Sequence, residues 1–175
     1  GSHNPSEYNG FKMVVNKHSF FSDNIQNFQS IVNKIKLEKK EGSIKSVNII
    51  DNYIERILKN ISIKNKMKIS WDIGNGAMGV VIKDLISKLK NTDNIILNQE
   101  VDGNFPNHHP DPTVPKNMEQ LIKSVKENKC DVGLAFDGDG DRLGVIDNLG
   151  NIVWADQYML VLCSEISNLY QNPKV

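Results

Sequence analysis

From residue 67 onward, apolar segments with the spacing of strands alternate with segments that have the spacing of helices. The alternation predicts strands at residues 67–73, 94–99, 132–136 and 143–146, and helices at residues 77–89 and 117–128. Strands that alternate with helices of this length indicate a mainly parallel sheet covered on both faces. The predicted fold class is therefore mixed α/β, with a mainly parallel sheet flanked by helices.

The segments on either side of this alternation have other patterns. Residues 11–40 are predicted to form a strand and then an amphipathic helix that begins at Ser22 or Asp23, and the charged residues 36–45 are the candidate linker. Residues 154–169 are predicted to be a helix that begins a further domain. A helix is also expected at residues 48–60, with these side chains facing the core: Tyr53, Ile54, Ile57 and Leu58.

Length and charge exclude several classes of protein. The 175 residues allow one full domain plus pieces of others, and a 39% share of hydrophobic residues is enough for a packed core. Lys and Arg balance Asp and Glu at 21 each, so no net charge attracts nucleic acid or an anionic membrane. No apolar run approaches the ~20 residues that span a bilayer. Cys130 and Cys163 are too few for a disulfide framework or a zinc site, and we expect reduced thiols in a cytoplasmic protein.

The segment from Phe136 to Arg142 reads Phe-Asp-Gly-Asp-Gly-Asp-Arg and directly follows a predicted strand. Its carboxylates, Asp137, Asp139 and Asp141, alternate with glycines, whose backbone freedom allows all three to face one point. Such massed negative charge is unfavourable unless a cation neutralises it, and oxygen ligands of this kind suit Mg²⁺ or Ca²⁺. The pattern therefore predicts a metal loop at the carboxyl end of a buried strand, with Arg142 beside it as a cation that holds phosphate.

An EF-hand and an acidic hairpin turn without a metal are the two other interpretations of this loop. An EF-hand needs glycine at its sixth position and a bidentate glutamate at its twelfth. Counting from Asp137, those positions hold Arg142 and Asn148, and the segment that follows has a strand pattern, so an EF-hand is excluded. An acidic hairpin turn without a metal is not excluded by composition, although a turn does not need three aspartates.

A second candidate site opens the chain, where Ser2 and His3 precede Asn-Pro and Asn-Gly pairs that are typical of a loop. Lys12 follows shortly downstream, so a nucleophile, a proton carrier and a fixed cation lie within one loop. Gly-Ser-His is also what a cleaved affinity tag leaves behind, and the spacing alone does not separate these two interpretations.

Taken together, these segments resemble the phosphoglucomutase/phosphomannomutase family of α-D-phosphohexomutases. Residues 1–12 are similar to that family's phosphoserine loop, residues 137–142 to its metal loop, and residues 100–112 to a further family segment. The agreement runs in the same order from the first residue to about residue 160. Because Ser2 and His3 stand where the family motif has them, the resemblance favours native sequence over a tag remnant.

The resemblance implies a role for each site residue. Ser2 would carry the phosphoryl group that is given to a hexose phosphate and recovered from a hexose 1,6-bisphosphate intermediate. His3 and Lys12 would assist proton transfer and charge neutralisation, and Arg142 would bind the substrate. The implied activity is the interconversion of hexose 1-phosphate and hexose 6-phosphate, with glucose and/or mannose as the sugar. Mg²⁺ would be held by a phosphate oxygen on Ser2 and by the carboxylates of Asp137, Asp139 and Asp141.

The resemblance also implies a division into domains. Residues 1–43 would be the C-terminal part of domain 1, residues 44–151 domain 2, and residues 152–175 the start of domain 3. The family's sugar-binding Gly-Glu-Met-Ser-Gly pattern does not occur in the chain, and no initiator methionine precedes Gly1. We therefore expect a cytoplasmic fragment of a larger enzyme, inactive alone. Its partners would be a phosphosugar substrate and the remaining domains, with neither nucleic acid nor membrane.

Two functions of other classes are alternatives. A phosphatase of the haloacid dehalogenase type would use Asp137 as nucleophile, but Asp141 occupies the place where that class has Thr or Val. The string Gly74 to Gly79 fits G-x-G-x-x-G and would suit a non-catalytic nucleotide-binding module. Asp72, two residues before Gly74, would repel a pyrophosphate, so a tight structural turn is favoured. His108 and His109 are expected to have structural roles, because adjacent side chains of an extended segment point to opposite sides.

Overall fold

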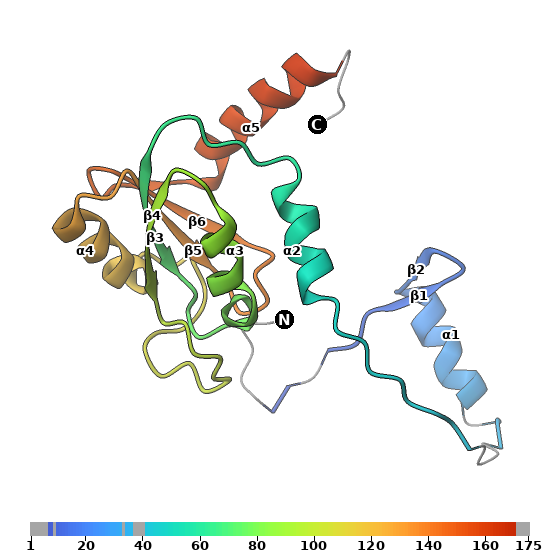
Figure 1. Cartoon of the computed structure of the whole chain (residues 1–175). Helices are drawn as coiled ribbons and strands as arrows, with labels where there is room; N and C mark the ends of the chain where they lie inside the picture. Colours follow the sequence, from blue (N-terminus) through green and yellow to red (C-terminus); the bar gives the residue numbers. More distant parts are fainter. Residues whose placement is uncertain (1–6, 9, 33, 37–40, 171–175) are drawn as a thin grey trace. The chain divides into compact units, whose positions relative to one another are not determined.

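A computed structural model describes residues 7–170 of the chain, apart from residues 9, 33 and 37–40. It divides into two compact units, Glu7–Asn48 and the segment from Ile49 onward (Figure 1). No helix within the described residues combines the length and the apolar character that crossing a membrane requires.

The first unit is a β-hairpin followed by a helix. Strands β1 (Met13–Val15) and β2 (His18–Phe20) pair antiparallel, and Asn16 and Lys17 form the turn between them with φ of 50° and 67°. Positive φ at both turn residues is typical of two-residue hairpin loops. The sequence predicted one strand here, because Asn-Lys is a weaker turn signal than Asn-Gly. Helix α1 (Asp23–Val32) begins at one of the two residues predicted.

The second unit contains a five-stranded sheet in the order β4-β3-β5-β6-β7. Strand β3 pairs parallel with β4 and β5, whereas the β5–β6 and β6–β7 pairs are antiparallel. The predicted mixed α/β class is confirmed. The strands are β3 (Met67–Asp72), β4 (Thr92–Leu97), β5 (Val132–Phe136), β6 (Leu143–Asp147) and β7 (Ile152–Val153), of which β7 was not predicted.

Helices cover both faces of this sheet (Figure 1). Helices α2 (Ile50–Leu58) and α3 (Ile82–Lys88) bury Ile54, Ile82 and Leu85 against one face. Helix α4 (Glu119–Asn128) buries Leu121 and Val125 against the other. Side chains alternate along β3, where Ile69 and Trp71 join the first cluster and Ser70 hydrogen-bonds Ser124 of α4.

Several helix boundaries differ from the prediction. The helix expected at residues 77–89 is a 3₁₀ turn, η1 (Ala77–Val80), followed by α3. The helix expected at residues 117–128 is preceded by a second 3₁₀ turn, η2 (Pro115–Met118), before α4 begins. Helix α2 buries Ile54 as predicted, but Tyr53 is 49% exposed, so its predicted core position is wrong. Helix α5 (Ala155–Leu169) has no buried side chain.

Candidate metal centre

The acidic loop is the turn of a β-hairpin. Strand β5 ends at Phe136, β6 begins at Leu143, and these two residues are paired across the antiparallel ladder. The turn closes through a hydrogen bond from the Gly140 amide to the Asp137 carbonyl of 3.1 Å. Gly140 has a φ of 77°, a conformation that side chains disfavour, so this glycine makes the tight turn possible.

Ligand atoms of Asp137, Asp139 and Asp141 all lie within 4.8 Å of one another. Asp137 is buried, with 1% of its surface exposed, whereas the other two side chains are exposed. Hard carboxylate oxygens gathered in this way fit Mg²⁺ or Ca²⁺ and not the softer metals. The donor set therefore suits a divalent cation, which these three aspartates would hold.

Arg142 lies against the buried member of the trio. Its backbone amide and its Nε donate to the two carboxylate oxygens of Asp137 at 3.0 and 2.9 Å. Its Nη1 donates to Asp111 Oδ1 at 3.2 Å. The hydrogen bond to Asp137 raises the pKa of Arg142 above its usual value, so the guanidinium stays charged. A fixed cation thus lies at the edge of the acidic loop.

The glycine loop after β3 packs against the acidic loop. The Ala77 amide donates to the Gly138 carbonyl at 2.8 Å. A Cβ on Gly76 would lie 2.7 Å from the same carbonyl oxygen, so only glycine fits at this close approach. The glycines at residues 74–79 therefore allow close contact between two loops of the protein. This agrees with the tight structural turn that the sequence favours.

Three segments at the carboxyl edge of the sheet meet at Asp72. This carboxylate is 1% exposed and accepts hydrogen bonds from the Gly74 amide at 3.0 Å, Asn98 Nδ2 at 2.9 Å and His108 Nε2 at 2.9 Å. The His108 side chain is 13% exposed. His109 instead places its ring edge-on to Phe105, with centroids 6.4 Å apart. The two adjacent histidines thus have separate contacts.

The pKa of His108 is raised from 6.5 by its hydrogen bond to Asp72, with a further contribution from the His109 carbonyl, although burial opposes the rise. A raised pKa in the folded state means that protonation of His108 stabilises the fold. This stabilisation is complete below the unfolded pKa and is lost as pH rises through the folded pKa. We expect the free energy of unfolding, relative to His108→Gln, to fall with rising pH in urea titrations between pH about 5.5 and about 8.5. An unchanged difference across this range would contradict the ion pair.

The placement of the remaining predicted site residues beside this loop stays a prediction. Ser2 and His3 lie outside the described residues, so their place beside the aspartates stays a prediction. Lys12 is exposed and belongs to the first unit, and its role in the site also stays a prediction. Asp72 and Asp111 were not proposed as site residues from the sequence. The signal for Asp72 was its position directly at the carboxyl end of a strand, where ligand loops of such sheets lie.

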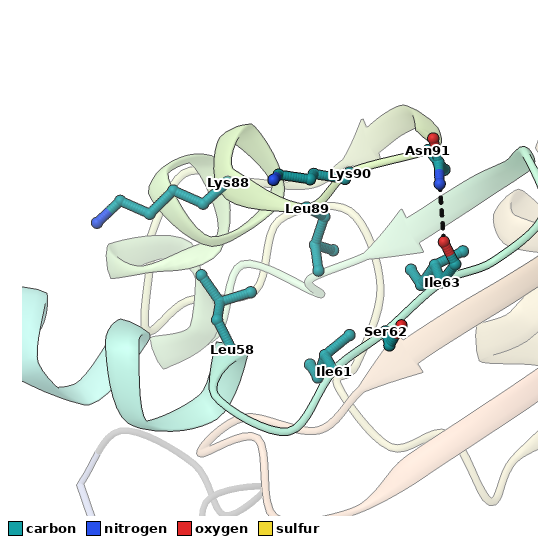
Figure 2. A pocket seen from close by; sticks show the side chains of 8 residues that line it. All are labelled: Leu58, Ile61, Ser62, Ile63, Lys88, Leu89, Lys90 and Asn91. Carbon is teal, nitrogen blue, oxygen red and sulfur yellow. Dashed lines mark hydrogen bonds between the residues drawn. The ribbon is translucent and has the colours of Figure 1, made fainter.

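Two hollows lie at different ends of the second unit. A cavity of about 490 Å³ beside Asp141 and Arg142 is lined mainly by apolar side chains, among them Trp154 and Tyr158. A hollow of about 390 Å³ lies at the amino ends of β3 and β4. There Asn91 Nδ2 donates to the Ile63 carbonyl at 2.8 Å, and the lining side chains are drawn in Figure 2. The residues described as lining this second hollow include Lys88 and Lys90 but none of the predicted site residues.

This sheet, with an acidic trio in the hairpin after its central strand, defines an α/β domain with a candidate divalent-cation centre. Residues 51–150 match the family model described as phosphoglucomutase/phosphomannomutase, alpha/beta/alpha domain II. The chain therefore belongs to the phosphoglucomutase/phosphomannomutase family, which confirms the resemblance seen in the sequence.

Named relatives agree with this membership. The chain is 45% identical over 173 residues to a phosphomannomutase/phosphoglucomutase of Pseudomonas putida, covering 99% of this chain and 37% of the relative. It is 40% identical over 177 residues to a phosphoglucomutase of Neisseria meningitidis, covering 100% of this chain and 38% of that protein. The chain thus spans less than half the length of these relatives.

A solved structure shows the same fold. The crystal structure of a phosphoglucomutase/phosphomannomutase family protein from Burkholderia thailandensis superposes with a TM-score of 0.85 at 37% identity. The superposition covers 95% of this chain and 36% of that one. None of these comparisons supports the phosphatase or the nucleotide-binding alternative.

Proposed function

We propose that the chain is the part of a phosphosugar mutase that contains the phosphoserine loop and the metal loop. The enzyme interconverts hexose 1-phosphate and hexose 6-phosphate, with glucose and/or mannose as the sugar. The observation that carries the proposal is the convergence of Asp137, Asp139 and Asp141 within 4.8 Å in a chain of this family. We propose residues 1–43, 44–151 and 152–175 as its parts of three successive domains.

In this proposal Ser2 is the phosphoryl carrier. The Oγ–P bond of phosphorylated Ser2 breaks as a sugar hydroxyl takes the phosphoryl group, which gives a hexose 1,6-bisphosphate. The second phosphate of that intermediate then returns to Ser2 Oγ and releases the isomeric monophosphate. His3 takes or returns the hydroxyl proton at each transfer, and Lys12 neutralises charge on the moving group.

The acidic loop contributes charge and position. Asp111 and the three aspartates of the trio carry four negative charges. Arg142 supplies one positive charge against them, and a bound dication would supply two. When bound there, Mg²⁺ supplies positive charge to phosphoryl oxygens in the transition state. Arg142 donates through Nε to Asp137 and through Nη1 to Asp111, and these two hydrogen bonds fix the orientation of its guanidinium. The guanidinium in this orientation is proposed to bind a phosphate of the substrate.

The test is the chemical identity of the phosphorylated residue in a protein that carries this chain together with the remaining domains. After incubation with glucose 1,6-bisphosphate, we expect mass spectrometry to find an acid-stable phosphate on Ser2. An acid-stable phosphate fits a phosphoserine, because an aspartyl phosphate is an acyl phosphate that hydrolyses readily. A labile phosphate on Asp137 would contradict the mutase and favour the phosphatase alternative.

We further propose that activity requires the remaining domains and that the enzyme acts in the cytoplasm. The relatives are more than twice as long as this chain, and the equal counts of 21 basic and 21 acidic residues offer no general attraction for nucleic acid or membrane. In a coupled assay the chain alone should show no turnover. Turnover at ordinary enzyme rates by the chain alone would contradict this part of the proposal.

A further inference from the structure

The buried Asp72 carboxylate joins three loops that are distant in sequence. It closes the first turn of its own loop through Gly74, it holds the residue after β4 through Asn98, and it holds the segment before η2 through His108. Asn98 Nδ2 also donates to Gln120 Oε1 of α4 at 2.9 Å. A carboxylate that is 1% exposed and accepts three hydrogen bonds is strongly oriented, because each bond would be lost if the side chain rotated.

The loop that Asp72 closes reaches the candidate metal centre directly. Beyond Gly74, the Ala77 amide donates at 2.8 Å to the carbonyl of Gly138, which lies between the first two aspartates of the trio. Met78 packs at Gly140, where a Cβ would lie 2.7 Å from Met78 Cγ. Both glycines of the acidic loop are therefore in contact with the loop that starts at Asp72.

A second residue of the same loop secures it to the rest of the edge. Asn75 lies in the left-handed region with a φ of 58°, its Nδ2 donates to the Glu100 carbonyl at 2.8 Å, and its Oδ1 accepts from Asn107 at 2.8 Å. The loop is thus hydrogen-bonded at both of its ends and at Asn75 between them. A displacement at Asp72 would be passed to Ala77 and from there to Gly138.

We propose that Asp72 is a positioning residue for the metal loop, which sets the backbone of Gly138 and thereby the approach of the Asp137 and Asp139 carboxylates to the cation. The proposal rests on the metal site of the proposed function. Asp72 itself is not a ligand in this arrangement, since its oxygens are engaged by the three donors named above. Groups that directly hydrogen-bond metal ligands change metal affinity by about 10–100-fold. Asp72 acts through the intervening loop, so we expect an effect at the lower end of that range.

The experiment measures Mn²⁺ binding to the 175-residue chain by electron paramagnetic resonance, with circular dichroism to confirm folding of every variant. Asp72→Ala removes all three acceptor contacts and should weaken Mn²⁺ binding about tenfold. Asp72→Asn keeps an oxygen that can accept from Gly74 and Asn98, so it should restore most of the affinity. Asp93→Ala, an exposed aspartate on neighbouring β4, is the matched control and should leave the affinity unchanged.

The variants separate this inference from the metal site itself. If the unaltered chain binds Mn²⁺ and Asp137→Ala abolishes binding, the metal site stands. A folded Asp72→Ala variant with unchanged affinity then overturns the positioning role alone. If the unaltered chain does not bind Mn²⁺, or Asp137→Ala binds equally well, the metal site and this inference both fail.

A milder variant keeps the inference testable if Asp72→Ala does not fold. His108→Ala removes one of the three hydrogen bonds to Asp72 and lies in an edge loop, outside the strands and helices. This variant should weaken Mn²⁺ binding by less than Asp72→Ala does. The control is His109→Gln, which alters the neighbouring histidine that contacts Phe105 and should leave Mn²⁺ binding unchanged. Equal affinity of a folded His108→Ala variant and the unaltered chain would contradict the inference.

Discussion

In the proposed phosphosugar mutase, replacing Asp139 with alanine should lower the turnover number by roughly 10²–10³-fold and remove the dependence on Mg²⁺. Asp139 is exposed, so its loss should not disturb the core. It is, however, one of three carboxylates within 4.8 Å, and without it only two remain to hold the cation. The transition state of phosphoryl transfer is stabilised mainly by cations at the phosphoryl oxygens. The measurement is a coupled mutase assay over a range of Mg²⁺ concentrations.

The control for this prediction is Asp84→Ala. Asp84 is an exposed aspartate of α3 that does not belong to the trio, so the change removes the same charge from the same unit. Its turnover number and Mg²⁺ dependence should match those of the unaltered enzyme. Full activity of the Asp139→Ala enzyme with unchanged Mg²⁺ dependence would mean that the metal lies elsewhere.

The largest expected effect on stability is at Ile146. This side chain is completely buried on β6, in a cluster that includes Met118 and Leu121 on the α4 side of the sheet. Ile146→Ala removes buried methyl and methylene groups and leaves a cavity, which should lower the free energy of unfolding by about 2–5 kcal/mol. A loss of this size is a large share of the stability of a small domain. Urea unfolding followed by tryptophan fluorescence measures it, since Trp71 is 7% exposed and stacks on Phe136.

Ile146→Val is the matched control, because it keeps the branched shape and removes one methylene. It should cost only about 0.5–1.5 kcal/mol. The ratio of the two losses tests whether Ile146 is as tightly packed as its complete burial indicates. Equal and small losses for both variants would show that the cluster on this face of the sheet relaxes around the missing groups.

Local sequence patterns were sufficient for strand β5 and for the acidic loop, but not for β2 and β7. Strand β5 was predicted with its observed bounds, since Val132 to Phe136 is a short apolar run that ends in a polar loop. The convergence of Asp137, Asp139 and Asp141 follows from local geometry too, because glycines separate carboxylates within one turn. The predicted helix at residues 77–89 was less accurate. Close packing of Gly76 on Gly138, which no local pattern reveals, accompanies the 3₁₀ turn there.

The long-range contacts around the acidic loop could not be predicted from local sequence patterns. Asp72 and His108 are separated by 36 residues, and Arg142 and Asp111 by 31, yet each pair forms a hydrogen bond. Sequence spacing gave no reason to pair them, since the segments between them form other elements. The structural role expected for His108 was correct in kind, but its partner and its raised pKa became visible only in the folded chain.

By itself, then, the amino-acid sequence determined the alternation of strands and helices and the carboxylates that gather in one hairpin, because hydrophobic periodicity and a six-residue turn act over short distances. The family followed from the resemblance of its loops to known motifs. Tertiary structure alone decided which distant groups meet at the carboxyl edge of the sheet. The parallel pairing of β3 with β5 brings the loop after Asp72 beside the loop that begins at Asp137. Buried polar groups need hydrogen-bond partners. The fold supplies Asn98 and His108 as donors to Asp72, and Arg142 as a donor to Asp137.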